Sequence, residues 1–271
     1  MSRTVMNELV AYVAGIGVRG PGLADWPHAE AVMCALQPYV YSATLLPAPE
    51  TLPPTERRRT GRAVRLAFAV GLEAARHAGV EPVQLPVVFA SSGGDGDNCH
   101  EICQTLASAN RALSPTRFHN SVHNAPAGYW SIAAGTQVPS TTICAYDASF
   151  AAGLLEALTQ IAVHGGASAL IAYDLDYPPP LRAARIVPAA FGLALVLHAS
   201  PQPHSLAQLR VRISTGPADR VELQELEALR AAIPAAQGLV LLEAIAKRQA
   251  TSVSIAYLEP QTLHIAVTPC R

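Results

Sequence analysis

Short runs of uninterrupted apolar residues, each closed by turn-forming residues, constrain the fold of this chain more than any other feature. Such runs are typical of strands buried on both faces of a sheet, because both sides of the strand then contact apolar neighbours. A further segment, 208–214, has partly alternating side chains, and we expect it to be antiparallel to the strand before it. The apolar runs predict strands at residues 9–16, 85–90, 140–145, 168–173 and 190–198.

Segments with helical periodicity separate most of these strands. Apolar residues recur at helical spacing over residues 60–77, and Gly79 follows where a left-handed helix cap is expected. Strands that alternate with helices indicate an α/β layered fold with a mostly parallel central sheet. No clear linker occurs, so residues 1–271 are predicted to form a single domain. Further helices are expected at 97–110, 148–164, 219–232 and 238–248, and two final strands at 252–258 and 262–267.

The composition excludes several classes of function. Half of the 271 residues are apolar and 14% are charged, which predicts a well-filled interior and an additional surface covered by a partner. With 19 basic and 20 acidic residues the net charge is −1, so neither nucleic acid nor an anionic membrane is an expected partner. The start of the chain lacks the order of a signal peptide, and no run of about 18 apolar residues occurs, so a cytoplasmic protein is expected.

A glycine-rich loop at residues 91–97 follows an expected strand and precedes an expected helix. It matches neither the dinucleotide-binding motif nor the P-loop, and Asp95 and Asp97 would repel a phosphate. We therefore expect a tight structural turn, with Asp97 as the cap of the next helix.

Two pairs of residues have the i,i+4 spacing of metal ligands. Cys99 and Cys103 fall on the apolar face of their expected helix, where free cysteine behaves as a small hydrophobic residue. His119 and His123 lie in a loop with no helix to align them. Tetrahedral zinc requires four convergent ligands, and no zinc motif is present, so no metal site is predicted. The five cysteines are an odd number scattered along the chain and are expected to be free thiols.

Residues 114–157 are the most informative region. They combine a polar, aromatic loop, a strand and a sharp turn into an apolar helix. A residue at such a turn faces the positive end of the helix dipole, where a thiol would have a lowered pKa and act as a nucleophile. The turn residue here is Asp147, and aspartate stabilises a helix start by about 0.5–2 kcal/mol relative to alanine. Asp147 is therefore expected to cap the helix, whereas Cys144 is expected to be a buried strand residue.

Five segments resemble a known family and together cover about residues 8–200. They are VAYVAGIGVRGPGL at 10–23, RRRTGRAVRLAFAVGLEAARHAGV at 57–80, VVFASSGGD at 87–95, residues 114–157 and FGLALVLH at 191–198. They resemble the N-terminal half of β-ketoacyl synthases, and most of all the short ketosynthase-like proteins of aryl-polyene and xanthomonadin-type pigment clusters. The resemblance implies a thiolase-like α/β fold with a complete N-terminal half, a truncated C-terminal half in residues 201–271, and no cofactor.

The resemblance also implies where catalytic residues would lie. Ketosynthases of this type carry a nucleophilic cysteine at the turn and two histidines in HGTGT-like and GGHN-like motifs. An ungapped alignment backwards from residues 154–157 places Asp147 at the cysteine position and Cys144 three residues earlier. After residue 200 the only histidines are His204 and His264, in neither motif. The chain is thus similar to a chain-length factor, a non-catalytic subunit that pairs with an active ketosynthase. If the alignment is shifted, Cys144 is instead the nucleophile of a thiolase-like acyltransferase.

The same resemblance places the polar loop near a dimer seam and an acyl channel. The alternative is structural: asparagine and histidine hold loop backbone groups, and the aromatic residues fill the core. The partner is expected to be an active ketosynthase or a second copy of this chain, because strands pair across the two-fold axis in the superfamily. A self-associating structural protein without an acyl ligand is a third hypothesis. The candidate pocket and interface residues are His119, Asn120, His123, Asn124, Tyr129, Trp130 and Phe150.

A run of arginines precedes the helix expected at residues 60–77. Such a run is usually a solvated helix start. The resemblance offers a second interpretation, in which the run contacts the acidic surface of an acyl carrier protein. The candidates are Arg57, Arg58, Arg59 and Arg62.

Overall fold

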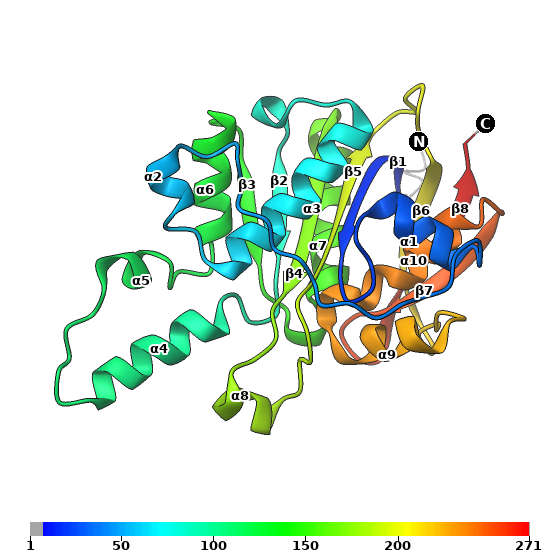
Figure 1. Ribbon diagram of the computed structural model, residues 1–271. Coiled ribbons are helices and arrows are strands. Elements are labelled where there is room, and N and C mark those ends of the chain that lie inside the picture. Colours follow the sequence, from blue (N-terminus) through cyan, green and yellow to red (C-terminus); the bar gives the residue numbers. More distant parts are fainter. Residues whose placement is uncertain (1–7, 271) are drawn as a thin grey trace.

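The computed structural model describes residues 8–270, in which all strands belong to one eight-stranded sheet (Figure 1). The strand order is β3-β2-β4-β5-β1-β6-β8-β7. Strands β2, β4 and β5 are almost wholly buried, which explains their uninterrupted apolar sequences. The strands are β1 Leu9–Arg19, β2 Val87–Ala90, β3 Ser140–Ile143, β4 Ala167–Asp174, β5 Phe191–His198, β6 Ala207–Thr215, β7 Thr251–Ala256 and β8 Gln261–Pro269. The predicted α/β class is confirmed.

The sheet is mixed, so the prediction of a mostly parallel sheet is wrong. β2 is parallel to β3 and β4, whereas the five other pairs of neighbouring strands are antiparallel. A parallel return needs a connection that crosses a face of the sheet. The connection from β4 to β5 carries only α8 (Pro179–Ala184), which lies beyond the strand ends in Figure 1, so β5 returns antiparallel to β4. β5 and β6 run on opposite sides of β1 and do not pair with each other.

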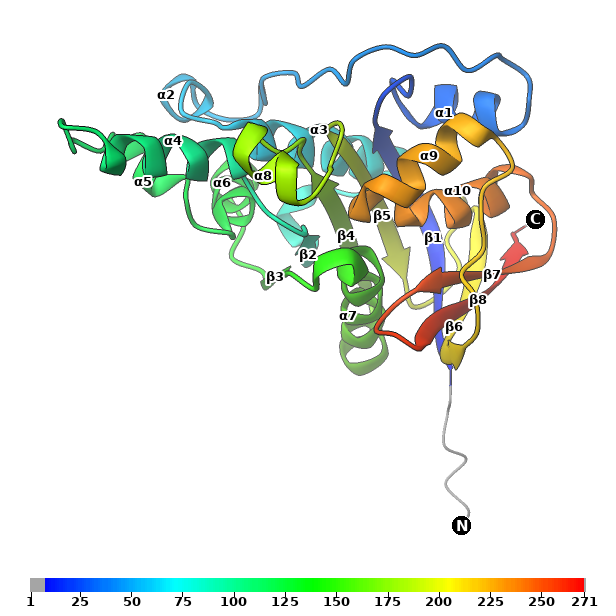
Figure 2. The same ribbon diagram turned by 90° about the horizontal axis from the view of Figure 1, so that it is seen from below.

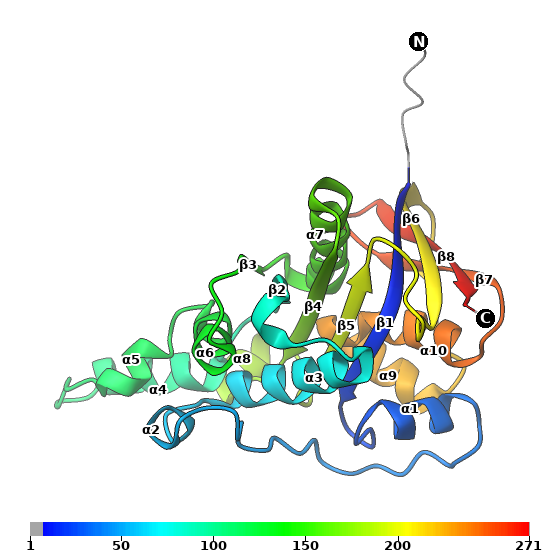
Figure 3. The same cartoon turned by 90° about the horizontal axis from the view of Figure 1, so that it is seen from above.

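Helices cover both faces of the sheet (Figure 2, Figure 3). α3 (Arg62–Ala78) and α6 (Ala125–Ala134) pack in one apolar core, and α7 (Ser149–His164) and α10 (Leu239–Ala246) pack in the other. The predicted helix at 60–77 and its cap are confirmed, because α3 ends at Gly79 with a φ of 66°. The remaining helices are α1 Trp26–Met33, α2 Pro54–Arg57, α4 Gly96–Ala107, α5 Pro115–His119 and α9 Gln224–Ala232, with the short 3-10 helices η1 Pro82–Gln84, η2 Tyr146–Ala148 and η3 Pro234–Gly238.

Side chains of α3 complete the hydrogen bonding of β1. β6 pairs only with the first part of β1, so backbone N–H groups further along that edge need other partners. Nδ1 of His77 accepts from the Ile16 N–H at 3.2 Å, and the Glu73 carboxylate accepts from the Val18 N–H at 3.3 Å. Glu73 also accepts from the Trp26 N–H at 2.5 Å. A single carboxylate thus ties α3 to β1 and to the start of α1.

The last part of the chain joins the same sheet instead of forming a separate layer. β6, β8 and β7 extend the sheet beyond β1, and apolar residues of α9, η3 and α10 belong to the core that α7 covers. The two helices and two strands predicted after residue 218 are present, with ends shifted by a few residues. Within residues 8–270, no helix combines the length and the apolar character needed to cross a membrane.

Helices α4 and α5 extend away from the sheet (Figure 1, Figure 2), and we call residues 96–119 the α4–α5 arm. Asp95, and not Asp97, caps α4: its carboxylate accepts from the Asn98 N–H at 3.0 Å. Cys99 and Cys103 are exposed, so their predicted place on a buried face is wrong. The reason is that α4 packs on α5 and points away from the sheet, which leaves most of its surface to solvent.

Candidate functional site

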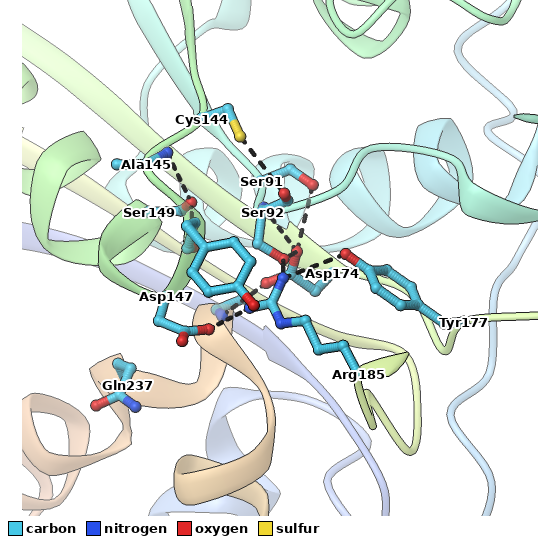
Figure 4. Close-up of polar contacts among 12 residues, drawn as sticks. Ser91, Ser92, Cys144, Ala145, Asp147, Ser149, Asp174, Tyr177, Arg185 and Gln237 are labelled. Atoms are coloured by element: carbon cyan, nitrogen blue, oxygen red, sulfur yellow. Dashed lines mark hydrogen bonds and ion pairs between the residues drawn. The ribbon is translucent and has the colours of Figure 1, made fainter. Parts of the chain in front are cut away.

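The bend between β3 and α7 is the centre of the candidate site (Figure 4). Tyr146 has a φ of 52°, a left-handed conformation that is costly for a residue with a side chain. The strained position of the bend is therefore Tyr146, one residue before Asp147. Ser149 fixes this turn, because its hydroxyl accepts from the Ala145 N–H at 3.0 Å and donates to the Tyr146 carbonyl at 2.7 Å.

Asp147 does not cap α7, so that prediction is wrong. The N-cap position is Ala148, which makes no side-chain capping bond, and Asp147 lies in the 3-10 turn η2 before the helix begins. The Asp147 carboxylate instead forms an ion pair with Arg185. The aspartate is 68% exposed and the arginine 17% exposed, so the pair lies at the surface of the site.

Arg185 connects the bend to two neighbouring segments. Its guanidinium carbon lies 3.9 Å from the centre of the Tyr146 ring, a cation–π contact. Its Nη1 donates to the Tyr177 hydroxyl at 3.3 Å and contacts the Ser92 hydroxyl at 3.5 Å. The arginine thus covers the bend from the loop that follows β4 (Figure 4).

The buried carboxylate of Asp174 organises the floor of the site. Its Oδ1 accepts from the Ser92 N–H at 2.8 Å, the Ser92 hydroxyl at 2.7 Å and the Ser91 hydroxyl at 3.3 Å. Its Oδ2 accepts from the Ala235 N–H at 2.8 Å. Burial raises the pKa of Asp174, and these hydrogen bonds oppose the shift. The carboxylate therefore joins the end of β4, the loop after β2 and η3.

Cys144 lies immediately after β3 and is exposed, so its predicted burial within the strand is wrong. Its Sγ lies 3.4 Å from the Ser92 carbonyl oxygen, which is its hydrogen-bond partner. All nine histidines of the chain lie within residues 8–270, and none makes a hydrogen bond to Cys144 or Asp147 there. A thiol or carboxylate nucleophile usually needs a neighbouring base or cation to activate it. In the part of the chain that the structure describes, Arg185 is the cation that contacts the bend, and it pairs with Asp147.

The structure brings together three of the predicted interface residues. The Tyr129 hydroxyl donates to Oδ1 of Asn120 at 3.0 Å, and the His119 ring meets the Tyr129 ring edge to face at 5.9 Å between centres. Nδ2 of Asn120 donates to the Arg59 carbonyl at 2.7 Å. Asn124 occupies the N-cap position of α6 without a side-chain capping bond. These contacts fasten the end of α5 to α6 and to the turn before α3.

The other predicted interface residues lie apart. Trp130 belongs to the core beneath α3, where its ring meets Phe68 and Phe89 edge to face. Phe150 is fully buried in the opposite core, on the α7 side of the sheet. His123 lines a small cavity close to Gly94.

The arginine run divides between two environments. Arg57 ends α2, Arg58 and Arg59 are exposed in the turn after it, and Arg59 pairs with Glu56 at 3.3 Å. Arg62 begins α3 and bridges Asp97 at 2.7 Å and Asp176 at 2.5 Å, so its charge is compensated within the chain. The acidic partners of the run are therefore Glu56, Asp97 and Asp176.

The sequence reasoning missed Asp174, Tyr177, Arg185 and Ser92 as site residues. Asp174 follows the apolar run of β4 and Ser92 follows that of β2. Polar residues at the carboxyl ends of neighbouring parallel strands meet at one edge of a sheet, and this signal could have found both. Among residues 8–270, no three histidine, cysteine or acidic side chains gather as metal ligands.

Comparison with protein families gives one match. Residues 31–258 match the model of the β-ketoacyl synthase N-terminal domain. No curated protein sequence matches the chain.

Solved structures share the fold at low sequence identity. A ketosynthase in complex with its chain length factor, ApeO and ApeC from Xenorhabdus doucetiae, gives a TM-score of 0.73 at 22% identity over 95% of this chain and 99% of that chain. A type II polyketide synthase acyl-carrier protein in complex with its ketosynthase, AntDE:AntF, gives 0.77 at 10% identity over 97% and 100%. The ketosynthase from module 1 of the bacillaene synthase of Bacillus amyloliquefaciens gives 0.56 at 15% identity over 80% and 48%. The thiolase-like fold predicted from the sequence is confirmed, and this chain covers about half of the last of these structures.

Proposed function

Because the chain belongs to the family of the β-ketoacyl synthase N-terminal domain, we propose that it is a chain-length-factor-like subunit. It has no acyl-transfer activity of its own and assists an active ketosynthase that builds fatty acyl or aryl-polyene chains on an acyl carrier protein in the cytoplasm. One observation carries the proposal. The bend that would present a nucleophile bears Tyr146 and Asp147, both held by Arg185.

The chemistry of the bend supports a non-catalytic role. A tyrosine or carboxylate is a weak nucleophile toward a thioester, and a carboxylate would give a mixed anhydride. The guanidinium of Arg185 pairs with Asp147 and stacks on the Tyr146 ring, so both side chains of the bend are already engaged within the chain. The backbone of a ketosynthase-like turn is kept while the reactive group is replaced.

An open strand edge supports a protein partner. β3 is the terminal strand of the sheet and pairs only with β2 among the described strands. The Ile143 carbonyl accepts from Ser91 on the β2 side, so the neighbouring Thr142 directs its backbone groups outward. The helix α6 contacts β3, and exposed apolar side chains occur on α6, on α5 and on the loop between them: Ile132, Phe118 and Val122. An unpaired edge of this kind is a template for a strand of another chain.

The proposed carrier-protein contact uses the exposed part of the arginine run. Arg58 and Arg59 are exposed, and Arg57 lies beside them. Arg62 contributes less, because Asp97 and Asp176 already neutralise it. Long-range attraction between a basic segment and an acidic carrier would increase the association rate and weaken at high salt.

Pull-down of the co-expressed ketosynthase tests the proposal. We expect a stable complex with the wild-type chain and its loss in Thr142→Pro, because proline removes the outward N–H of β3 while an edge strand tolerates it. Thr142→Val keeps the N–H and should bind like wild type. A monomer that binds no ketosynthase, or a homodimer alone, would contradict the heterodimer.

The exposed thiol of Cys144 supports one alternative, a thiolase-like acyltransferase. This alternative predicts that a chloroacetamide probe labels Cys144 at a rate well above that of the exposed Cys99 and Cys103. We expect equal, slow labelling of the three thiols instead, since no imidazole contacts Cys144.

A further inference from the structure

Two buried polar groups at the root of the α4–α5 arm have no hydrogen-bond partner among residues 8–270. The hydroxyl of Tyr173, near the end of β4, is unpartnered, and the side chain is 0% exposed. Nε2 of His123, in the loop between α5 and α6, is also buried and unpartnered. Because nearly all buried polar groups in proteins are hydrogen-bonded, two such groups in one place require an explanation.

Both groups belong to residues that line the same small cavity. The cavity has a volume of about 10 Å³ and is also lined by Gly94, Asp95 and Asn120. A volume of about 10–15 Å³ holds one water molecule and is too small for an organic ligand.

The polar neighbours of the cavity are already engaged elsewhere. The Ser91 hydroxyl donates to Asp174 and accepts from the Gly94 N–H at 2.9 Å. The side-chain amide of Asn120 uses its oxygen for Tyr129 and its nitrogen for Arg59. The Ser91 hydroxyl lies close to the Tyr173 hydroxyl, but it is already engaged by Asp174 and Gly94, and the two unpartnered groups make no hydrogen bond to a described side chain.

We propose that this cavity is a binding site for a single structural water molecule. The Tyr173 hydroxyl donates to the water, and the water donates to Nε2 of His123 and to the Asp95 carboxylate. These three groups give the water the two to four polar partners that buried waters have. Burial also raises the pKa of Asp95, as expected for a carboxyl group in a site with little access to solvent.

The position of the water links the arm to the sheet. Asp95 caps α4, His123 follows α5, and Tyr173 belongs to β4, so the water joins both ends of the arm to a central strand. We infer that it fixes the direction in which the arm projects. A role of the arm in binding a ketosynthase rests on the proposed function, but the water site itself does not.

A crystal structure of the isolated chain at about 1.8 Å or better tests the site directly. The expected result is one water within hydrogen-bond distance of the Tyr173 hydroxyl and Nε2 of His123. A dry cavity, or a Tyr173 hydroxyl bonded directly to Ser91, would overturn the proposal.

Hydrogen exchange tests the effect on the arm. Tyr173→Phe removes one partner of the water, and we expect amides of α4 and α5 to exchange about tenfold faster than in the wild type. Tyr12→Phe is the matched control, because its hydroxyl bonds Gln208 at 2.7 Å between β1 and β6, away from the arm. Unchanged exchange in Tyr173→Phe, or the same increase in Tyr12→Phe, would contradict the inference.

Binding of the co-expressed ketosynthase, measured for the wild type and for Tyr173→Phe, distinguishes the water-site proposal from the proposed function. If Tyr173→Phe loosens the arm and weakens the complex several-fold, the water acts through partner docking. If the water and the exchange effect are found while the wild-type chain binds no ketosynthase, the water site stands and the proposed function fails.

Discussion

Asp174 holds the floor of the candidate site together. Its buried carboxylate accepts four hydrogen bonds from two segments that are distant in sequence, the loop after β2 and η3. Asp147 is its opposite, an exposed carboxylate with one arginine partner. Both are aspartates close to Arg185, but the buried Asp174 is expected to contribute more to the free energy of unfolding than the exposed Asp147.

Asp174→Asn should lower the free energy of unfolding by about 2–4 kcal/mol. The amide nitrogen would face donors such as the Ser92 N–H or the Ala235 N–H, so at least one buried donor would lose its acceptor. Urea denaturation measures the change. Asp147→Asn is the matched control, and its effect should stay within about 1 kcal/mol because exposed ion pairs contribute little. Equal losses of unfolding free energy in the two variants would contradict a larger contribution of Asp174.

The residues of the site were only partly predictable from the sequence. The strand before Asp147 and the helix after it predict its place near the bend, because this information is local in sequence. Its partner Arg185 is 38 residues away and follows a short helix with no pattern of its own. The left-handed conformation of Tyr146 was equally hidden, since tyrosine does not favour it.

Elements were predicted well where the pattern was local and poorly where it depended on pairing. Uninterrupted apolar runs located β2, β4 and β5 because burial on both faces leaves a direct mark on sequence. Whether β5 is parallel or antiparallel to β4 depends on the path of the connection between them, and the hydrophobic pattern of the strands does not indicate that path. The helix α4 was expected to be half buried, but it projects from the body, so its apolar positions are not core positions.

The packing of α3, β1 and α1 around Glu73 makes stability depend on pH. Burial raises the pKa of Glu73 from 4.5 to about 7, despite the hydrogen bonds from Trp26 and Val18. The folded state therefore holds a proton that the unfolded chain loses above pH 4.5. The stability associated with this proton is present below pH 4.5 and is lost as the pH rises through 7, on the order of 3 kcal/mol in total.

Unfolding free energies measured between pH 4 and 8 test this dependence. Relative to Glu73→Gln, which cannot ionise, the wild type should lose stability across that range. Glu30→Gln removes a carboxylate from α1 and should keep the wild-type profile. A wild-type profile parallel to that of Glu73→Gln would show that Glu73 does not titrate in this window.

In the molecule as a whole, all the described strands belong to one sheet. Residues after 200 add β6, β8 and β7 to the edge of β1, and the other edge of the sheet, at β3, is left open. The family match could be anticipated from segments 57–80, 87–95, 114–157 and 191–198, which all lie within the matched residues. The way in which the last strands complete the sheet could not be predicted from the sequence, because it depends on contacts between segments far apart in the chain.

The proposed role of this chain is to shape an assembly without carrying acyl groups itself. Intact-mass spectrometry of the co-purified pair, after incubation with an acyl-thioester donor, measures this most directly. We predict an acyl mass increase on the ketosynthase only, with this chain unmodified and product formation unchanged in Cys144→Ala. A mass increase on this chain that Cys144→Ala abolishes would contradict the account.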